Sequence, residues 1–268
     1  MKVALPAIHD TGTGPPVVFF HAFPLDASQW DHQVAALSDR FRCLRPDFWG
    51  CGDSPPPPPD GSALGDFVEA TLQALDEREV DSFVAVGLSL GGYLIMEFLR
   101  QAPERVRGAV LADTRSTADA EGPRNDRLEM ADRVLREGVD GIVEPTVERL
   151  LAAQSQAHAH VSDPVRGRVR RCRPEGVAAA QRAMAARPDS GQLLGSLTIP
   201  VLVVGGSQDR ASPPDVMASM ATSIPGSRHE VIDGVGHLSN LEDPPAFTAI
   251  LERFLLEVTD ERTAPSAS

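Results

Sequence analysis

A serine on a glycine-flanked turn is the residue best suited to chemistry in this sequence. Ser89 stands in the middle of Gly87-Leu88-Ser89-Leu90-Gly91, after the apolar run 83–88 and before a stretch with helical spacing. Glycines two residues either side of a serine relieve the crowding of a sharp strand-to-helix turn, which raises the hydroxyl above the sheet. The Leu90 amide would lie at a helix N-terminus, where it can stabilise an oxyanion. The pattern predicts that Ser89 is a nucleophile for acyl transfer.

A serine needs a base to remove its proton, and His237 is the best candidate. Wound α/β enzymes with this turn place the acid and then the histidine after the serine in the chain. His237 follows a late strand-like run on the glycine-flanked loop Gly234-Val235-Gly236-His237. The other histidines precede the serine, lie in a helical insert or begin a strand instead of following it. We therefore predict that His237 is the general base.

Two aspartates are candidates for the acid that orients the histidine. Asp209 follows the buried run 201–205, and Asp113 ends the buried run 109–113. Each would lie at the carboxyl edge of the sheet, where the sites of such folds collect. We favour Asp209, and Asp113 stays an alternative.

The elements that position these residues alternate between strand and helix. Short apolar runs bounded by Gly, Pro and Asp predict buried strands, and the stretches between them have helical spacing. These patterns predict an α/β fold with a mostly parallel, doubly wound sheet. The alternation stops over 115–195, which has helical patterns and no strand. We predict a core at 1–114 and 196–258, a helical cap at 115–195, inserted before the late strands, and a flexible tail at 259–268. The predicted strands are 17–23, 41–47, 83–88, 109–113, 201–205 and 228–232, and the predicted cap helices are 124–136, 139–152, 163–172 and 174–186.

Three further motifs, together with the serine turn, resemble the α/β-hydrolase superfamily. They are the loop His21-Ala22-Phe23-Pro24, the turn 46–54 and the ending 234–244. The loop and the small cap are most similar to 3-oxoadipate enol-lactonases and related carboxylesterases. The resemblance implies that the Phe23 amide is a second oxyanion donor and that His21 braces its loop. Haloalkane dehalogenases and epoxide hydrolases are similar in fold but use Asp where this chain has Ser89.

The cap holds a cluster of positive charges, five arginines within 166–173. Helical spacing places Arg166 and Arg170 on one face. They could cover a solvated surface, or one of them could turn inward and pair with a substrate carboxylate. Apolar side chains that could line an acyl pocket, or simply pack in the core, are Phe23, Trp49, Leu90, Leu238, Met130 and Met184.

The composition excludes several other classes of protein. With 38 acidic against 25 basic residues the net charge is −13, which argues against binding to nucleic acid or to an anionic membrane. The cysteines Cys43, Cys51 and Cys172 lie far apart without the spacing of a metal or redox site, so no disulfide is required and a reduced, cytoplasmic setting is expected. We find no metal, nucleotide or flavin motif and expect no cofactor. A homodimer is left open.

These observations favour a serine hydrolase that cleaves a small-molecule carboxylic ester or lactone through an acyl-enzyme on Ser89. A second interpretation keeps the fold but replaces the reaction with cofactor-free C–C hydrolysis, lyase chemistry, cyclisation or perhydrolysis. A third, from another class, is a ligand-binding protein with a vestigial triad.

Overall fold

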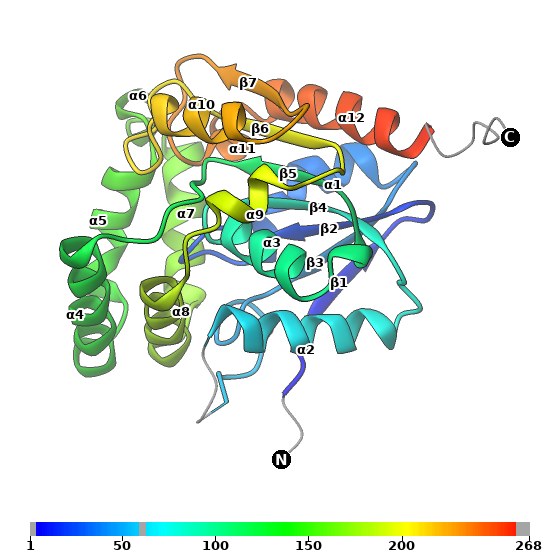
Figure 1. Ribbon diagram of the computed structural model, residues 1–268. Helices are drawn as coiled ribbons and strands as arrows, with labels where there is room; N and C mark the ends of the chain where they lie inside the picture. The colour runs from blue at the N-terminus through cyan, green and yellow to red at the C-terminus, as the bar shows by residue number, and fades with distance from the viewer. Residues whose placement is uncertain (1–3, 59–62, 261–268) are drawn as a thin grey trace, which may run out of the picture.

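The computed structural model describes residues 4–58 and 63–260, and within these ranges seven strands form one sheet. Their order is β1-β3-β2-β4-β5-β6-β7, and every pairing is parallel except that of β1 with β3 (Figure 1). The predicted mostly parallel sheet is therefore confirmed. The edge strand β1 has no counterpart among the predicted strands, because its residues are polar or partly exposed and leave no apolar run. The strands are β1 (Ile8–Thr11), β2 (Pro16–Phe20), β3 (Arg42–Pro46), β4 (Phe83–Leu88), β5 (Val106–Ala112), β6 (Val201–Gly206) and β7 (Arg228–Ile232).

Helices cover both faces of the sheet, so successive residues of a strand enter different cores. In β2, Val17 and Phe19 pack in one hydrophobic cluster, whereas Val18 and Phe20 pack in the other. The first cluster lies under α1 (Asp31–Leu37) and α12 (Pro244–Asp260). The second lies under three more helices of the core: α2 (Leu64–Asp76), α3 (Leu90–Gln101) and α10 (Pro214–Ser223). Short turns of helix complete the core: η1 (Ala27–Trp30), η2 (Pro103–Arg105), α9 (Gly191–Gly195) and α11 (Ser239–Glu242).

The helical block between β5 and β6 forms a layer beside the sheet, in green at the left of Figure 1. Pro145 lies inside α5 and Pro164 inside α7, as in the predicted helices 139–152 and 163–172. The core limits 1–114 and 196–258 and the cap limits 115–195 stay a prediction. The cap helices are α4 (Glu121–Glu137), α5 (Asp140–Leu150), α6 (Ala153–Gln156), α7 (Ala159–Arg171) and α8 (Pro174–Ala186).

A disulfide joins the cap to the core, which corrects the expectation of separate, reduced cysteines. Cys51, in the turn after β3, is bonded to Cys172 at the end of α7, and their Cα atoms are 4.2 Å apart. The two residues are 121 positions apart in the chain, so their spacing alone could not show that the fold brings them together. Cys43 is a buried free thiol.

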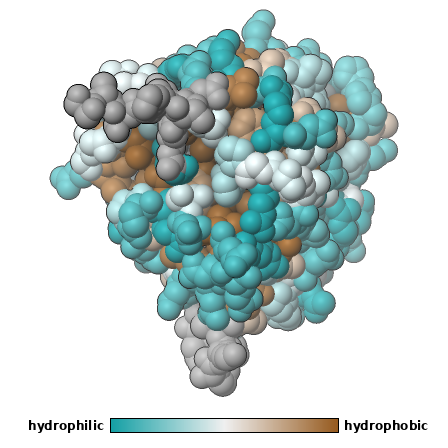
Figure 2. Space-filling model, turned by 90° about the vertical axis from the view of Figure 1, so that its right-hand side faces the viewer, coloured by the Kyte–Doolittle hydropathy of each residue, from teal (hydrophilic) through white to brown (hydrophobic). Residues whose placement is uncertain are grey.

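The C-terminal helix extends into the residues predicted to form a flexible tail. α12 continues to Asp260, so the first two residues of the predicted tail 259–268 are helical, and 261–268 lie outside the described residues. On the side of the molecule shown in Figure 2, hydrophilic residues cover most of the visible surface and hydrophobic ones lie between them. No helix in the described ranges is long and apolar enough to cross a membrane.

Candidate active site

Ser89 occupies the turn between β4 and α3, and its backbone is strained. Its φ of 57° and ψ of −109° lie outside the conformations that side chains other than glycine readily adopt. The flanking glycines are required sterically, because a Cβ on Gly91 would collide with the Phe20 carbonyl oxygen and one on Gly87 would collide with Gly91. The turn therefore holds the serine at the carboxyl end of β4, where its side chain lines a cavity beneath the cap.

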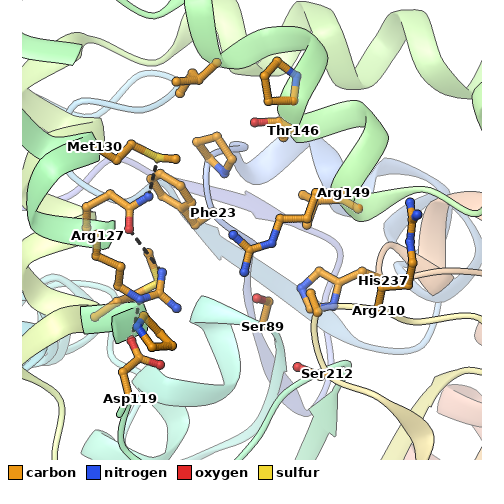
Figure 3. Close-up of a pocket in the computed structure, with 18 of the residues that line it drawn as sticks. Phe23, Ser89, Asp119, Arg127, Met130, Thr146, Arg149, Arg210, Ser212 and His237 are labelled. Atoms are coloured by element: carbon orange, nitrogen blue, oxygen red, sulfur yellow. Dashed lines mark hydrogen bonds and ion pairs between the residues drawn. The ribbon is translucent and has the colours of Figure 1, made fainter. Parts of the chain in front are cut away.

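The imidazole of His237 is held from behind by Asp209. Nδ1 of the ring is 2.8 Å from Asp209 Oδ2, and both side chains are buried. The second carboxylate oxygen accepts hydrogen bonds from the amides of Ala211 and Ser212 at 2.7 and 2.9 Å. Because Nδ1 is engaged, Nε2 is the nitrogen left to serve the cavity, in which Figure 3 shows His237 and Ser89 together.

Asp113, the alternative acid, does not bond to the histidine. Its carboxylate accepts hydrogen bonds from the Gly206 amide at 2.9 Å and from the Ser239 hydroxyl. Complete burial raises the pKa of Asp113 well above its ordinary value, and the neighbouring Asp209 raises it further. Of the two candidates, Asp209 is the one that the structure brings to His237.

The two backbone amides expected to bind the oxyanion have no hydrogen-bond acceptor among the described residues. Within the described ranges, neither the Phe23 amide nor the Leu90 amide donates a hydrogen bond to another residue. The loop that carries Phe23 is braced by His21, whose Nε2 accepts the Phe48 amide at 2.9 Å. Both amides are thus available to a ligand.

The cavity that holds Ser89 and His237 has a volume of about 340 Å³. Five of the sequence-predicted site and pocket residues line it, two of them in α4 and α8 of the cap: Ser89, His237, Phe23, Met130 and Met184. Several lining residues were not predicted, and most are charged or hydroxyl-bearing: Tyr93, Arg115, Asp119, Arg127, Thr146, Arg149, Arg210 and Ser212.

Five residues predicted to line the pocket or to bind substrate do not line this cavity, which corrects those expectations. Leu90 is buried in the core. Trp49 packs against Phe67, and its indole NH donates to Ala4, while Leu238 is fully buried in the core. Arg166 pairs with Glu144 and Arg170 lies near Asp140 on the outside of the cap. The reason is the phase of α7, which buries Val165, Arg168 and Val169 and leaves the other arginines outside.

The sequence of α5 contained a signal for Arg149, one of the cavity residues that were not predicted. Ile142, Pro145, Thr146, Arg149 and Leu150 all line the cavity, and they follow the i, i+3, i+4, i+7, i+8 spacing of one helix stripe. An arginine on an otherwise apolar stripe of a cap helix therefore indicates a side chain that faces the site.

Among the described residues, one cluster of side chains of the kinds that can bind a metal lies outside this cavity, and it consists of His9, Asp47 and Asp53. The Asp47 carboxylate already accepts hydrogen bonds from the amides of Ala27 and Asp53, at 2.6 and 2.9 Å. His9 Nε2 is 3.0 Å from the same carboxylate. These contacts fasten the turn after β3, and we assign no metal to them.

Comparison with known proteins agrees with this fold. The model of the α/β hydrolase fold family matches residues 15–244. This is most of the chain, so the protein belongs to that family.

Two relatives are similar over nearly their whole length. The solved structure of a thermophilic esterase from Thermogutta terrifontis, with malate bound, superimposes with a TM-score of 0.90 and 37% identity, covering 94% of this chain and 93% of that one. The 3-oxoadipate enol-lactonase 1 of Acinetobacter baylyi is 26% identical over 261 residues, 94% of this chain and 92% of that protein. The resemblance seen in the motifs is confirmed.

A third relative matches only in part. Haloalkane dehalogenase 2 of Mycobacterium bovis is 33% identical over 105 residues, which are 39% of this chain and 37% of that protein. The chain thus spans little more than a third of that relative's length.

Proposed function

We propose that this protein hydrolyses a carboxylic ester or lactone of a small molecule through an acyl-enzyme on Ser89. The observation that carries the proposal is the buried Asp209–His237 pair, which opens on the same cavity as the serine. Membership of the hydrolase family and similarity to an esterase and an enol-lactonase support it. The serine at the nucleophile position favours this reaction over dehalogenation, for which the family resemblance implies an aspartate there.

The reaction begins when His237 Nε2 takes the proton of the Ser89 hydroxyl and the oxygen attacks the substrate carbonyl. The amides of Phe23 and Leu90 donate to the oxyanion that forms. Asp209 stabilises the imidazolium and fixes its tautomer through Nδ1. His237 then gives its proton to the leaving alcohol, and a water molecule activated by the same base releases the acid.

Reaction with a fluorophosphonate probe tests the nucleophile directly. We expect stoichiometric labelling of the protein and a labelled peptide containing Ser89. The Ser89→Ala variant should not be labelled, whereas Ser212→Ala, which removes another hydroxyl of the cavity lining, should be labelled like the wild type. Labelling that persists in Ser89→Ala would contradict the proposal.

A panel of short esters and lactones tests the reaction itself. The wild type should release acid from at least one member, with a burst of alcohol equal to the enzyme concentration if deacylation is slow. Turnover without any sensitivity to fluorophosphonate would point instead to chemistry that forms no acyl-enzyme.

A further inference from the structure

Arg149 is a cation that faces the active-site cavity without a hydrogen-bond or ion-pair partner among the described residues. It lies in the last turn of α5 and lines the cavity together with Ser89 and His237. Figure 3 shows its guanidinium group pointing into the cavity above Ser89. Among the described residues, no carboxylate or carbonyl accepts a hydrogen bond from Arg149. A guanidinium carries five N–H donors and stays charged in proteins, so this group has unused binding capacity.

The surroundings of Arg149 on balance disfavour its charge. Burial lowers the pKa of Arg149 most, and the positive charges of Arg127 and Arg115 lower it further, while Tyr93 and Asp119 offset part of this effect. Asp119 lies nearby, but its carboxylate is already bonded to Arg127 at 2.5 Å and to Arg187 at 2.7 Å. An unpaired cation among like charges is costly to keep, and an anion that entered the cavity would remove that cost.

The charge of the cavity lining contrasts with that of the whole chain. Among the described lining residues there are four arginines and one carboxylate, Asp119, in a protein whose net charge is −13. Arg127 is held by Asp119, and Arg210 donates to the Glu148 carbonyl. Arg115, which is half-buried, is like Arg149 in making no such bond among the described residues. Arg149, Arg115 and Arg210 therefore have no carboxylate partner among the described residues, and of these Arg149 and Arg115 also have unused hydrogen-bond donors.

The backbone of α5 fixes Arg149 relative to the catalytic base. The His237 amide donates a 2.8 Å hydrogen bond to the carbonyl of Leu150, the residue next to Arg149. The Glu242 carboxylate accepts from the Ala152 amide at 2.9 Å and from the Gly236 amide at 3.0 Å. The end of α5 and the histidine loop thus form one hydrogen-bonded unit, which sets the position of the cation against the reacting groups.

We propose that Arg149, assisted by Arg115, binds a carboxylate of the substrate, so that this enzyme selects anionic esters or lactones derived from small dicarboxylic or hydroxycarboxylic acids. The inference rests on the proposed function. It assigns specificity to a side chain of α5 and not to the arginines of α7, and Arg149 acts as a substrate-binding residue with no part in proton transfer.

Matched pairs of esters test the inference. Monoethyl glutarate and ethyl pentanoate differ on the acyl side by a carboxylate in place of a methyl group, and 4-acetoxybutanoate and butyl acetate differ in the same way on the alcohol side. In at least one pair, Arg149→Gln should raise KM for the anionic ester about 10- to 100-fold, the range for a lost hydrogen-bonded charge pair. KM for the neutral partner should change less than about twofold, and Arg149→Lys should recover part of the loss because it restores the charge.

Arg166→Gln is the matched control, because Arg166 belongs to the same cap but pairs outward with Glu144. It should leave both members of each pair unchanged. Since Arg149 has no partner among the described residues to lose and its buried charge is costly to keep, Arg149→Gln should unfold at a temperature no lower than that of the wild type. Equal effects of Arg149→Gln on the anionic and neutral esters of both pairs would overturn the inference.

Calorimetric binding of glutarate separates this inference from the proposed function. In the Ser89→Ala background, which needs no catalysis, adding Arg149→Gln should weaken glutarate binding about tenfold or more. If no ester is turned over and yet glutarate binding depends on Arg149, the anion site stands and the proposed reaction fails. If esters are hydrolysed and glutarate binding is indifferent to Arg149, the reaction stands and the anion site fails.

Discussion

The core side and the cap side of the cavity differ in how the side chains of their key ionisable residues are paired. On the core side, Asp209 satisfies one nitrogen of His237, and two backbone amides satisfy the carboxylate oxygen that remains. On the cap side, Arg149 ends in the cavity without a partner among the described residues. Groups that are locked before substrate arrives suit catalysis, because they need not reorganise, whereas an unpaired group suits recognition. The comparison suggests that the core supplies the reaction and the cap supplies the selection.

The largest effect is expected for the serine on the core side. Ser89→Ala should lower kcat by roughly 10⁴- to 10⁶-fold for every substrate, neutral or anionic, because it removes the atom that forms the acyl-enzyme. Initial rates with the ester pairs described above measure this. A loss confined to the anionic esters would mean that Ser89 acts in selection, and the division between the two sides would fail.

Replacing each of the two buried aspartates with asparagine should have unequal effects on kcat. Asp209→Asn should lower kcat by about 10⁴-fold, because the amide favours the wrong tautomer of the histidine. Asp113→Asn should lower kcat less than about tenfold, since Asp113 bonds to Gly206 and Ser239 and not to His237. Comparable losses in the two variants would show that both carboxyls support the base.

Removing the disulfide that joins the cap to the core should affect the free energy of unfolding more than it affects kcat. Cys51→Ser combined with Cys172→Ser opens a loop of 121 residues and should lower the free energy of unfolding by about 2–4 kcal/mol. Urea titration of the oxidised protein measures the loss, and kcat for ethyl pentanoate should fall far less than in the serine variant. Identical unfolding midpoints with and without a reducing agent would refute this.

The smallest effect is expected within the cap side. Burial raises the pKa of Asp119, but hydrogen bonds from Arg187 and Arg127 outweigh it and lower the pKa to about 2. The carboxylate therefore stabilises the fold fully above about pH 4, and this contribution is lost as the pH falls toward about 2. Asp119→Asn should lower the free energy of unfolding by roughly 2 kcal/mol at neutral pH. The gap in Tm between variant and wild type should narrow as the pH falls from about 4 toward about 2, and a gap independent of pH would contradict the ion-pair explanation.

The core side could be predicted from the sequence because its residues follow strands. Ser89 comes directly after the buried strand β4, His237 lies on the loop that follows β7, and parallel strands bring their carboxyl ends to one edge of the sheet. The same rule could not choose between Asp113 and Asp209, because both follow strands that end there. Only the positions of β5 and β6 in the sheet show which carboxylate reaches the histidine.

The substrate-facing residues of the cap could not be predicted as well. Parallel strands end at a common edge of the sheet, but helices have no equivalent end where functional residues gather. The rotation of each cap helix about its axis decides which side chains face the cavity, and that rotation depends on packing against the core. The arginines around 166–173 were more conspicuous in the sequence than Arg149, yet α7 directs Arg166 and Arg170 outward. The disulfide was hidden for a related reason, since its cysteines meet only after the cap docks.

The hydrogen bond between the His237 amide and the Leu150 carbonyl restricts how substrate can be exchanged for product. If the whole cap moved away as one rigid body, it would pull on the loop that carries His237 and displace this base at every turnover. We expect substrate and product to pass while α5 stays in place, so that each new substrate meets a base that is already aligned.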